Sequence, residues 1–119
     1  MKYLSKPTIV DGIKFASKKE SLEYLKLKEL EKQNKISNLK LQPSFILQEG
    51  FTRGGKKYRP ITYVSDFEYK EGDETVVVEV KSKFTAKDKV YNIKKKMFLQ
   101  KYTDISFIEV IDGKSSEKM

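Results

Sequence analysis

The stretch ITYVSDFEYKEGDETVVVEVK, residues 61–81, predicts a β-hairpin on which the rest of the fold can be built. Both halves are rich in β-branched and aromatic residues, and the segment 71–74 between them, Glu-Gly-Asp-Glu, is typical of a tight turn. A symmetric register around that turn brings Asp66 opposite Glu79. Opposed residues of an antiparallel pair point to the same face, about 4.5–5.5 Å apart at Cβ. The pattern therefore predicts two neighbouring carboxylates.

Lys81 lies two residues beyond Glu79 and shares its face, because side chains alternate along a strand. Two carboxylates and an ammonium could hold a divalent cation and a phosphate. The alternative is an ordinary solvated sheet face. The alternate positions of this strand are all valine and already supply a core side, yet Val77 is apolar on the carboxylate side. We therefore expect that side to be partly covered, where opposed acids need a positive partner.

The composition narrows the class of protein. The chain has 119 residues, enough for about one small domain, and its 25 Lys and Arg against 17 Asp and Glu give a net charge of +8. Such a charge favours an anionic partner, either nucleic acid or an acidic membrane surface. We expect no membrane-spanning segment and no signal peptide, because no apolar run is long enough, and hence a cytoplasmic location.

The chain contains no Cys and no His. Thiol nucleophiles, disulfides, His-based triads and structural zinc sites are therefore excluded. Any catalysis must use Asp, Glu, Lys, Tyr, Ser or Thr. Carboxylates prefer hard cations, above all Mg²⁺ or Mn²⁺.

The order of predicted elements is helix, three strands, helix, strand. The first 16 residues are expected to be extended, with a turn at Asp11-Gly12, and the tail 113–119 to be disordered. The predicted fold class is α/β (α+β), a mixed central sheet flanked by helices, in a single domain over residues 1–112. The helices are expected at 17–33 and 86–102, the strands at 43–47, 61–69, 75–81 and 105–111, and a loop at 49–58.

Glu20 has two possible roles. Ser17 and Glu20 form a capping-box pattern, which stabilises the start of a helix without any catalytic part. Glu20 also falls on the same side of the helix as Tyr24 and Leu27, so it can point inward toward the hairpin. The two roles are compatible, and both remain open at this point.

Two further segments are strongly basic. Residues 52–59 carry four basic side chains and two glycines but no acid, which suits phosphate contacts as well as plain solvation. Residues 81–101 hold eight Lys and one acid, and Lys87, Lys94 and Lys101 recur every seven residues in an arc with Val90, Ile93, Met97 and Phe98. We expect Lys87 and Lys101 to snorkel and Lys94 to reach a phosphate at the carboxylate site. A calmodulin-target or membrane-surface helix is an alternative that the acidic hairpin disfavours.

Asp66 followed by Glu79-Val80-Lys81, with a helical Glu20 upstream, resembles the signature of the PD-(D/E)XK nuclease superfamily. That superfamily also has the element order αβββαβ, so the resemblance implies a restriction-endonuclease-like core. Nearly the whole chain is similar to a small phage and prophage family of endodeoxyribonucleases, which resemble Holliday junction resolvases and phage endonuclease I. The similarity rests on Val10-Asp11-Gly12, Phe15-x-Ser17-x-x-Glu20, Gln42-Pro43, Tyr58-Arg59-Pro60-Ile61-x-Tyr63, Ser65-Asp66-Phe67 and Ile93-Lys94-x-Lys96-x-Phe98.

The resemblance implies roles for the site residues. Asp66 and Glu79 would bind Mg²⁺, for which Mn²⁺ can substitute, with the Val80 carbonyl as a further ligand. Lys81 would orient or activate the attacking water, and Glu20 would complete the site. Ser82 departs from the glycine expected after the lysine, and Gln42 is a weaker site candidate that can equally be a strand-edge residue. From the two basic segments, the residues expected to contact DNA are Arg53, Lys56, Lys57, Arg59, Lys83, Lys87, Lys94 and Lys95.

The expected function is metal-dependent hydrolysis of DNA phosphodiesters, with branched duplex as the preferred substrate because no residue pattern suggests base reading. Paired cuts by a chain with one site require a symmetric homodimer. We expect no small-molecule cofactor, and a bacterial host cell as the setting of a phage-encoded protein. The alternatives are another PD-(D/E)XK nuclease, such as a nicking or restriction-like enzyme, a degenerate nuclease that retains only binding, and a non-catalytic nucleic-acid-binding module.

Overall fold

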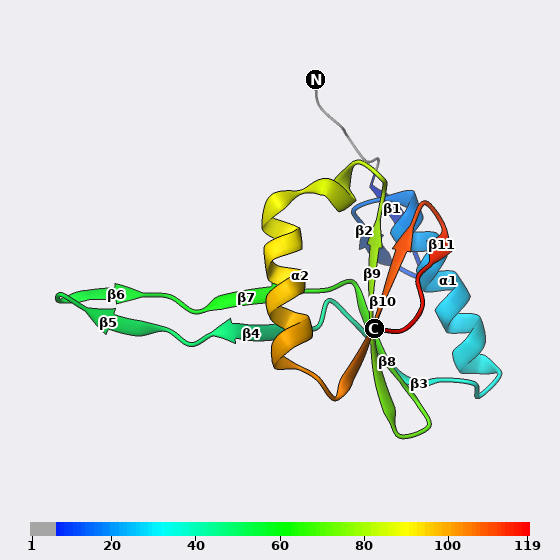
Figure 1. Ribbon diagram of the computed structural model, residues 1–119. Coiled ribbons are helices and arrows are strands. Elements are labelled where there is room, and N and C mark those ends of the chain that lie inside the picture. Colours follow the sequence, from blue (N-terminus) through cyan, green and yellow to red (C-terminus); the bar gives the residue numbers. More distant parts are fainter. Residues whose placement is uncertain (1–6) are drawn as a thin grey trace.

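The computed structural model describes residues 7–119 (Figure 1). Residues 1–6, which the sequence predicts to be extended, lie outside the described residues. The described chain opens with a hairpin of β1 (Thr8–Val10) and β2 (Ile13–Phe15). Asp11 and Gly12 form its turn with φ values of 53° and 74°, as expected for the predicted turn.

A five-stranded mixed sheet forms the centre of the fold, in the order β11-β10-β9-β8-β3. β9 and β10 run parallel and are joined through a helix, whereas the other neighbours are antiparallel. The chain thus has the α+β fold class that the sequence predicts. The strands are β3 (Ser37–Leu41), β8 (Phe67–Glu71), β9 (Glu74–Lys81), β10 (Ile105–Ile111) and β11 (Lys114–Ser115).

The hairpin β8–β9 has the predicted register. Glu71 pairs with Glu74, and the pairing runs outward to Phe67 opposite Val78. Asp66 lies just before β8 and donates its N–H to the Val78 carbonyl at 3.2 Å. Continuing the register by one residue places Asp66 opposite Glu79.

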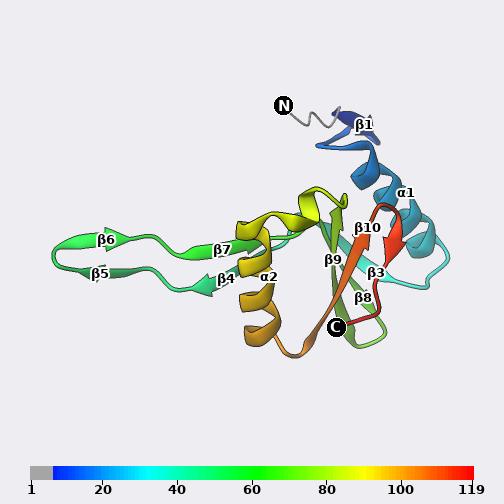
Figure 2. The ribbon, with the colours of Figure 1, turned by 45° about the horizontal axis from the view of Figure 1, so that its top comes forward.

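One helix covers each face of this sheet (Figures 1 and 2). α1 (Lys18–Lys32) packs on the face of Val76 and Val78, and α2 (Lys89–Lys101) on the face of Val77. Side chains alternate across the sheet, so the run of valines supplies two separate cores. Among the described residues, 7–119, no helix is long and apolar enough to cross a membrane.

A long two-stranded ribbon, the arm (residues 44–64), follows β3 and precedes β8 in the sequence. It projects from the body of the protein (Figures 1 and 2). Its base pairs β4 (Ser44–Gln48) with β7 (Ile61–Val64), and its outer part pairs β5 (Phe51–Arg53) with β6 (Lys56–Tyr58). The radius of gyration, 15.7 Å, exceeds the roughly 13.5 Å of a compact chain of this length. The arm accounts for this elongation.

The arm corrects two sequence predictions. The strand at 43–47 belongs to the arm and not to the sheet, and the predicted loop at 49–58 is a β-hairpin. The first strand of the sheet is instead β3, which the sequence analysis missed. β3 reads SNLKL and contains no β-branched or aromatic residue, and its pairing with β8 carries a register shift. Long-range pairing therefore formed this strand against its weak propensity.

Three other boundaries differ from the predictions. The strand expected at 61–69 breaks at residues 65–66, where the chain leaves the arm and enters the sheet. The second helix is preceded by the 3-10 turn η1 (Thr85–Lys87), because Asp88 leaves helical geometry and caps α2 by accepting from the Tyr91 N–H at 2.8 Å. The tail 113–119 is not disordered: β11 extends the sheet, and Phe107 and Met119 exchange backbone hydrogen bonds.

Candidate functional site

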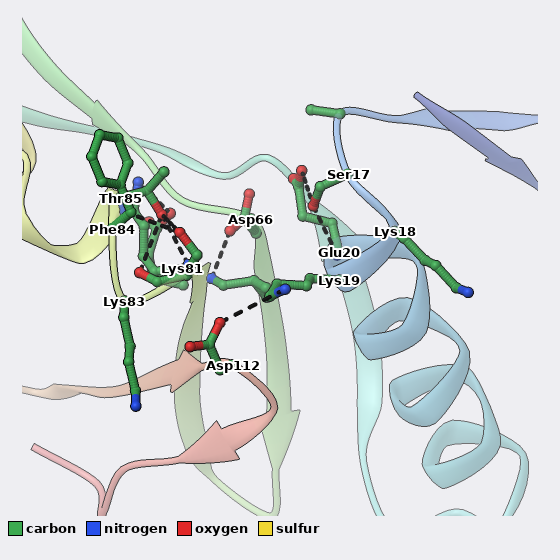
Figure 3. A pocket seen from close by; sticks show the side chains of 14 residues that line it. Ser17, Lys18, Lys19, Glu20, Asp66, Lys81, Lys83, Phe84, Thr85 and Asp112 are labelled. Atoms are coloured by element: carbon green, nitrogen blue, oxygen red, sulfur yellow. Dashed lines mark hydrogen bonds and ion pairs between the residues drawn. The ribbon is translucent and has the colours of Figure 1, made fainter. Parts of the chain in front are cut away.

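A pocket of about 590 Å³ opens where the start of α1, the end of β9 and η1 meet (Figure 3). Its lining includes all four side chains of the predicted site: Glu20, Asp66, Glu79 and Lys81. Further lining cations come from α1 and from the segment after β9: Lys18, Lys19 and Lys83. Lys19 Nζ lies 3.7 Å from Asp112, whereas the Lys18 and Lys83 side chains point away from Asp66 (Figure 3).

Asp66 is held by the backbone on both sides. The Val80 N–H donates to Asp66 Oδ2 at 2.7 Å, and the Gln42 N–H donates to the Asp66 carbonyl at 2.9 Å. Ser65 beside it is buried and donates its hydroxyl to the Val78 carbonyl at 2.8 Å. The short carboxylate–amide bond fixes the Asp66 side chain against β9.

Glu20 fulfils both of the roles left open by the sequence. Its N–H donates to Ser17 Oγ at 3.2 Å, and the Ser17 hydroxyl contacts Glu20 Oε2 at 3.3 Å, so the residue takes part in capping α1. Its carboxyl group also lines the pocket, where the Asp66 carboxylate is close enough to raise the Glu20 pKa. Figure 3 shows Glu20 and Ser17 at the start of α1 beside Asp66.

Glu79 is buried, at 5% exposure, and has a partner on each oxygen. The Tyr63 hydroxyl from β7 of the arm donates to Oε1, and Lys81 Nζ lies 3.6 Å from Oε2. The Lys81 ammonium also lies 4.3 Å from the centroid of the Tyr91 ring, a cation–π distance. The lysine is therefore held between a carboxylate and an aromatic face.

A second buried acid, Glu109, lies on the neighbouring strand directly beside Glu79. It accepts from the Tyr91 hydroxyl, and Lys95 Nζ lies 3.1 Å from its Oε2. Tyr63, Tyr91 and Glu109 are not among the site residues predicted from the sequence. The one signal for them in the sequence was a single acid, Glu109, in the mostly apolar strand 105–111.

Burial and mutual repulsion perturb the site acids. Burial, and then the charge of Glu79, raise the pKa of Asp66 to about 7. Burial and the neighbouring Asp66 raise the pKa of Glu20 to about 7 as well. Burial also raises the pKa of Glu79, against the opposing effects of Tyr63 and Lys81. The pocket thus favours the protonated form of both carboxyl groups, and a bound cation could supply the positive charge in place of a proton.

The donor set suits a hard divalent cation, because every available ligand atom is oxygen. Among residues 7–119, no group of three acids already surrounds one point as in a preformed metal site. Binding would therefore require Glu20 and Asp66 to be deprotonated and the side chains to reorient. Glu20, Asp66 and Glu79 are the residues that could hold the ion.

The structure separates the predicted DNA-contact residues into four places. Lys83 lines the pocket, and Lys87 is exposed in η1. Lys94 and Lys95 lie on α2 outside the pocket lining. The prediction that Lys94 reaches the carboxylate site was therefore wrong, and Lys95 pairs with Glu109. The remaining four lie on the outer arm: Arg53, Lys56, Lys57 and Arg59.

The predicted apolar arc of the second helix was partly wrong. Val90 and Ile93 are each 59% exposed, whereas Tyr91 and Phe98 form the buried face. Tyr91 and Lys95 lie on one side of the helix and both bond Glu109, which turns that side toward the sheet. Lys101 donates to the Ile46 carbonyl at 2.9 Å and so contacts the arm.

The chain thus combines an α+β fold with a pocket lined by three acids and a lysine, Glu20, Asp66, Glu79 and Lys81. Residues 1–116 match the family described as "Protein of unknown function (DUF1064)", and the chain belongs to that family. No curated protein matches the sequence. Among solved structures, the chain is similar to one described as "Crystal structure of SSO0001", with 15% identity and a TM-score of 0.42. The match covers 81% of this chain and 47% of that chain, so this chain spans about half its length.

Proposed function

We propose that this protein is a metal-dependent endodeoxyribonuclease of the PD-(D/E)XK type that cuts branched DNA, in the manner of a Holliday junction resolvase. One observation carries the proposal: Glu20 of α1, Asp66 before β8, and Glu79 and Lys81 of β9 line a single pocket. This is the combination of groups that the sequence resemblance implies. The raised pKa values of Glu20 and Asp66 add that the pocket favours an additional positive charge.

Asp66 and Glu79, with the Val80 carbonyl and Glu20, would hold Mg²⁺, or Mn²⁺ in its place. The bound ion would activate water and offset charge on the phosphate. Tyr63 holds one oxygen of Glu79, so the carboxylate keeps a defined orientation. Lys81, fixed between Glu79 and the Tyr91 ring, would orient the attacking water and stabilise negative charge on the scissile phosphate.

Two groups of cations would hold the phosphate backbone. Lys18, Lys19 and Lys83 are among the residues that line the pocket. The basic side chains of the outer arm, together with Lys87, Lys94 and Lys95, would contact the flanking duplex. Affinity would then fall steeply as salt is raised, because each phosphate contact releases counterions.

A branched substrate calls for a symmetric homodimer, since each chain brings one pocket and a junction is resolved by two cuts. For a phage or prophage protein, the working compartment would be the cytoplasm of the bacterial host.

The test is cleavage of a synthetic four-way junction, with a linear duplex of the same sequence alongside. Wild type, Asp66→Ala and a control, Asp104→Ala, are compared in Mg²⁺, in Mn²⁺ and in EDTA. Asp104 is an exposed acid outside the pocket lining, so its loss should not matter. We expect paired nicks in the junction with either metal, lost in EDTA and in Asp66→Ala. Equal cutting of the duplex would remove the junction preference and favour a nicking or restriction-like nuclease.

A non-catalytic nucleic-acid-binding module is the second candidate. The arm favours it, because the basic side chains of the arm offer a DNA-binding surface away from the acids. This candidate predicts that no substrate is cut with either metal. It also predicts that Asp66→Ala binds DNA as tightly as wild type.

A further inference from the structure

The outer part of the arm is solvated on both faces. Every residue from Gln48 to Ile61 is exposed, so no core residue supports this ribbon. An isolated two-stranded hairpin is at best marginally stable in water. The stability of this ribbon therefore depends on local interactions and not on the hydrophobic core.

Three local features of this kind are present. Gly54 and Gly55 form the end turn with φ values of 59° and 75°, the geometry that favours a tight hairpin. Phe51 and Tyr58 are directly opposed across the ribbon, and their rings stack with centroids 4.8 Å apart and planes 11° apart. At the neck of the ribbon, a Cβ on Gly50 would lie 3.0 Å from the Tyr58 carbonyl oxygen, so the two strands meet there without a side chain between them.

The aromatic pair remains half in water even though its rings are stacked. Phe51 is 45% exposed and Tyr58 is 43% exposed. Residues 49–60 contain four basic side chains and one acid, and Lys56 Nζ lies 5.3 Å from the centre of the Tyr58 ring. Exposed aromatic rings among cations suit a nucleic acid: the cations contact phosphates, and the rings can stack on bases.

The two kinds of group respond to different features of DNA. Phosphates are present on intact duplex and branched DNA alike, so the cations cannot distinguish them. Base faces are available for stacking only where strands separate and bases leave the helical stack. A ring pair on the outer part of a projecting ribbon can therefore recognise the place where a duplex is interrupted.

Resting on the proposed function, we propose that Phe51 and Tyr58 stack on bases exposed at a branch point, and that this contact gives the protein its preference for branched over linear DNA. The arm cations then contribute affinity without selectivity. The pocket cuts whichever strand the arm has positioned.

The experiment measures binding and not cleavage, in EDTA, so it does not depend on a working active site. The probes are a four-way junction with 2-aminopurine at the branch point and a linear duplex with 2-aminopurine at its centre. The variants are Phe51→Val with Tyr58→Val, the conservative Tyr58→Phe, and Lys57→Ala. Valine is a good strand former, and cross-strand contacts in NMR spectra report whether the arm is still formed.

We expect the double-valine variant to lose about tenfold or more in affinity for the junction and to keep its duplex affinity. Its branch-point fluorescence should no longer change on binding. Tyr58→Phe keeps the ring and should keep the preference, and Lys57→Ala should weaken both probes alike. Should the double variant unfold the arm, Tyr58→Val alone is compared with Tyr58→Phe.

If the double-valine variant loses the same affinity for junction and duplex, or loses none for either, the inference is overturned. The proposed function still stands in that case, provided that wild type binds DNA. Failure of wild type to bind either DNA would overturn both.

Discussion

Replacing Asp66 by asparagine should make the metal-free protein more stable at alkaline pH. The pKa of Asp66 rises from an ordinary 3.8 to about 7 in the folded protein, chiefly because the carboxyl group is buried. The folded state therefore prefers the protonated form. The stabilisation is complete below about pH 4 and is lost as the pH rises through about 7, because the group must then ionise in a pocket that disfavours its charge.

The magnitude follows from that difference. A rise of about three pKa units corresponds to about 4 kcal/mol between the two protonation states. The pocket is open to solvent, which screens the charge, so we expect about half of this, about 2 kcal/mol, to be observed. The substituted asparagine carries no charge at any pH, and its side-chain oxygen can still accept from the Val80 N–H. At pH 8 the variant should therefore exceed wild type by about 2 kcal/mol, and near pH 4 the two should be nearly equal.

The assay is urea unfolding of wild type, Asp66→Asn and Asp104→Asn at several values between pH 4 and 8, in EDTA. Asp104 is exposed, so the control should follow wild type throughout. A gain that is the same at pH 5 and pH 8 would show that charge is not its source. An Asp66→Asn protein less stable than wild type at pH 8 would refute the account of the pocket.

Three other outcomes are expected. Mg²⁺ at 100 times its Kd should raise the unfolding free energy of wild type by about 2.7 kcal/mol and leave Asp66→Asn nearly unchanged, as thermal unfolding with and without the metal would show; equal shifts in both would place the ion elsewhere. Tyr63→Phe should cost about 1–3 kcal/mol in urea unfolding, because buried Glu79 loses a donor, whereas Tyr58→Phe on the exposed arm should cost little. Gly50→Ala should distort the neck of the arm, since its Cβ would lie 3.0 Å from the Tyr58 carbonyl oxygen, and NMR shifts should change from residue 49 to 60 but not in α1; an unchanged spectrum would contradict this packing.

The sequence was informative where short-range geometry decides the outcome. The turn at 71–74 sets the register of β8 and β9, and the register places Asp66 against Glu79 without reference to the rest of the chain. Ser17 caps the start of α1, and this fixes the position of Glu20 in the first turn of the helix. The pocket could be predicted because two local elements supply most of it.

Long-range pairing was beyond the same reasoning. β3 has a largely polar sequence, and its strand conformation is stabilised by pairing with β8. A contact with α1 adds to this, because the Leu39 N–H donates to the Glu31 carboxylate at 3.1 Å. The buried face of α2 carries Tyr91, whose hydroxyl donates to Glu109 on a different strand, so the helix sequence alone did not identify this face. The polar tail resembles a disordered end, yet its backbone extends the sheet beside β10.

The solvated ribbon between Gln48 and Ile61 has a consequence for how such a chain can change over generations. Opposed residues there touch neither core cluster, so residues could be gained or lost in matched pairs at small thermodynamic cost. Each added pair would lengthen the reach by about 3.3 Å. A single unmatched residue would instead turn every following side chain to the opposite face. The distance between the pocket and the end of the arm is thus adjustable in fixed steps, independently of the stability of the body.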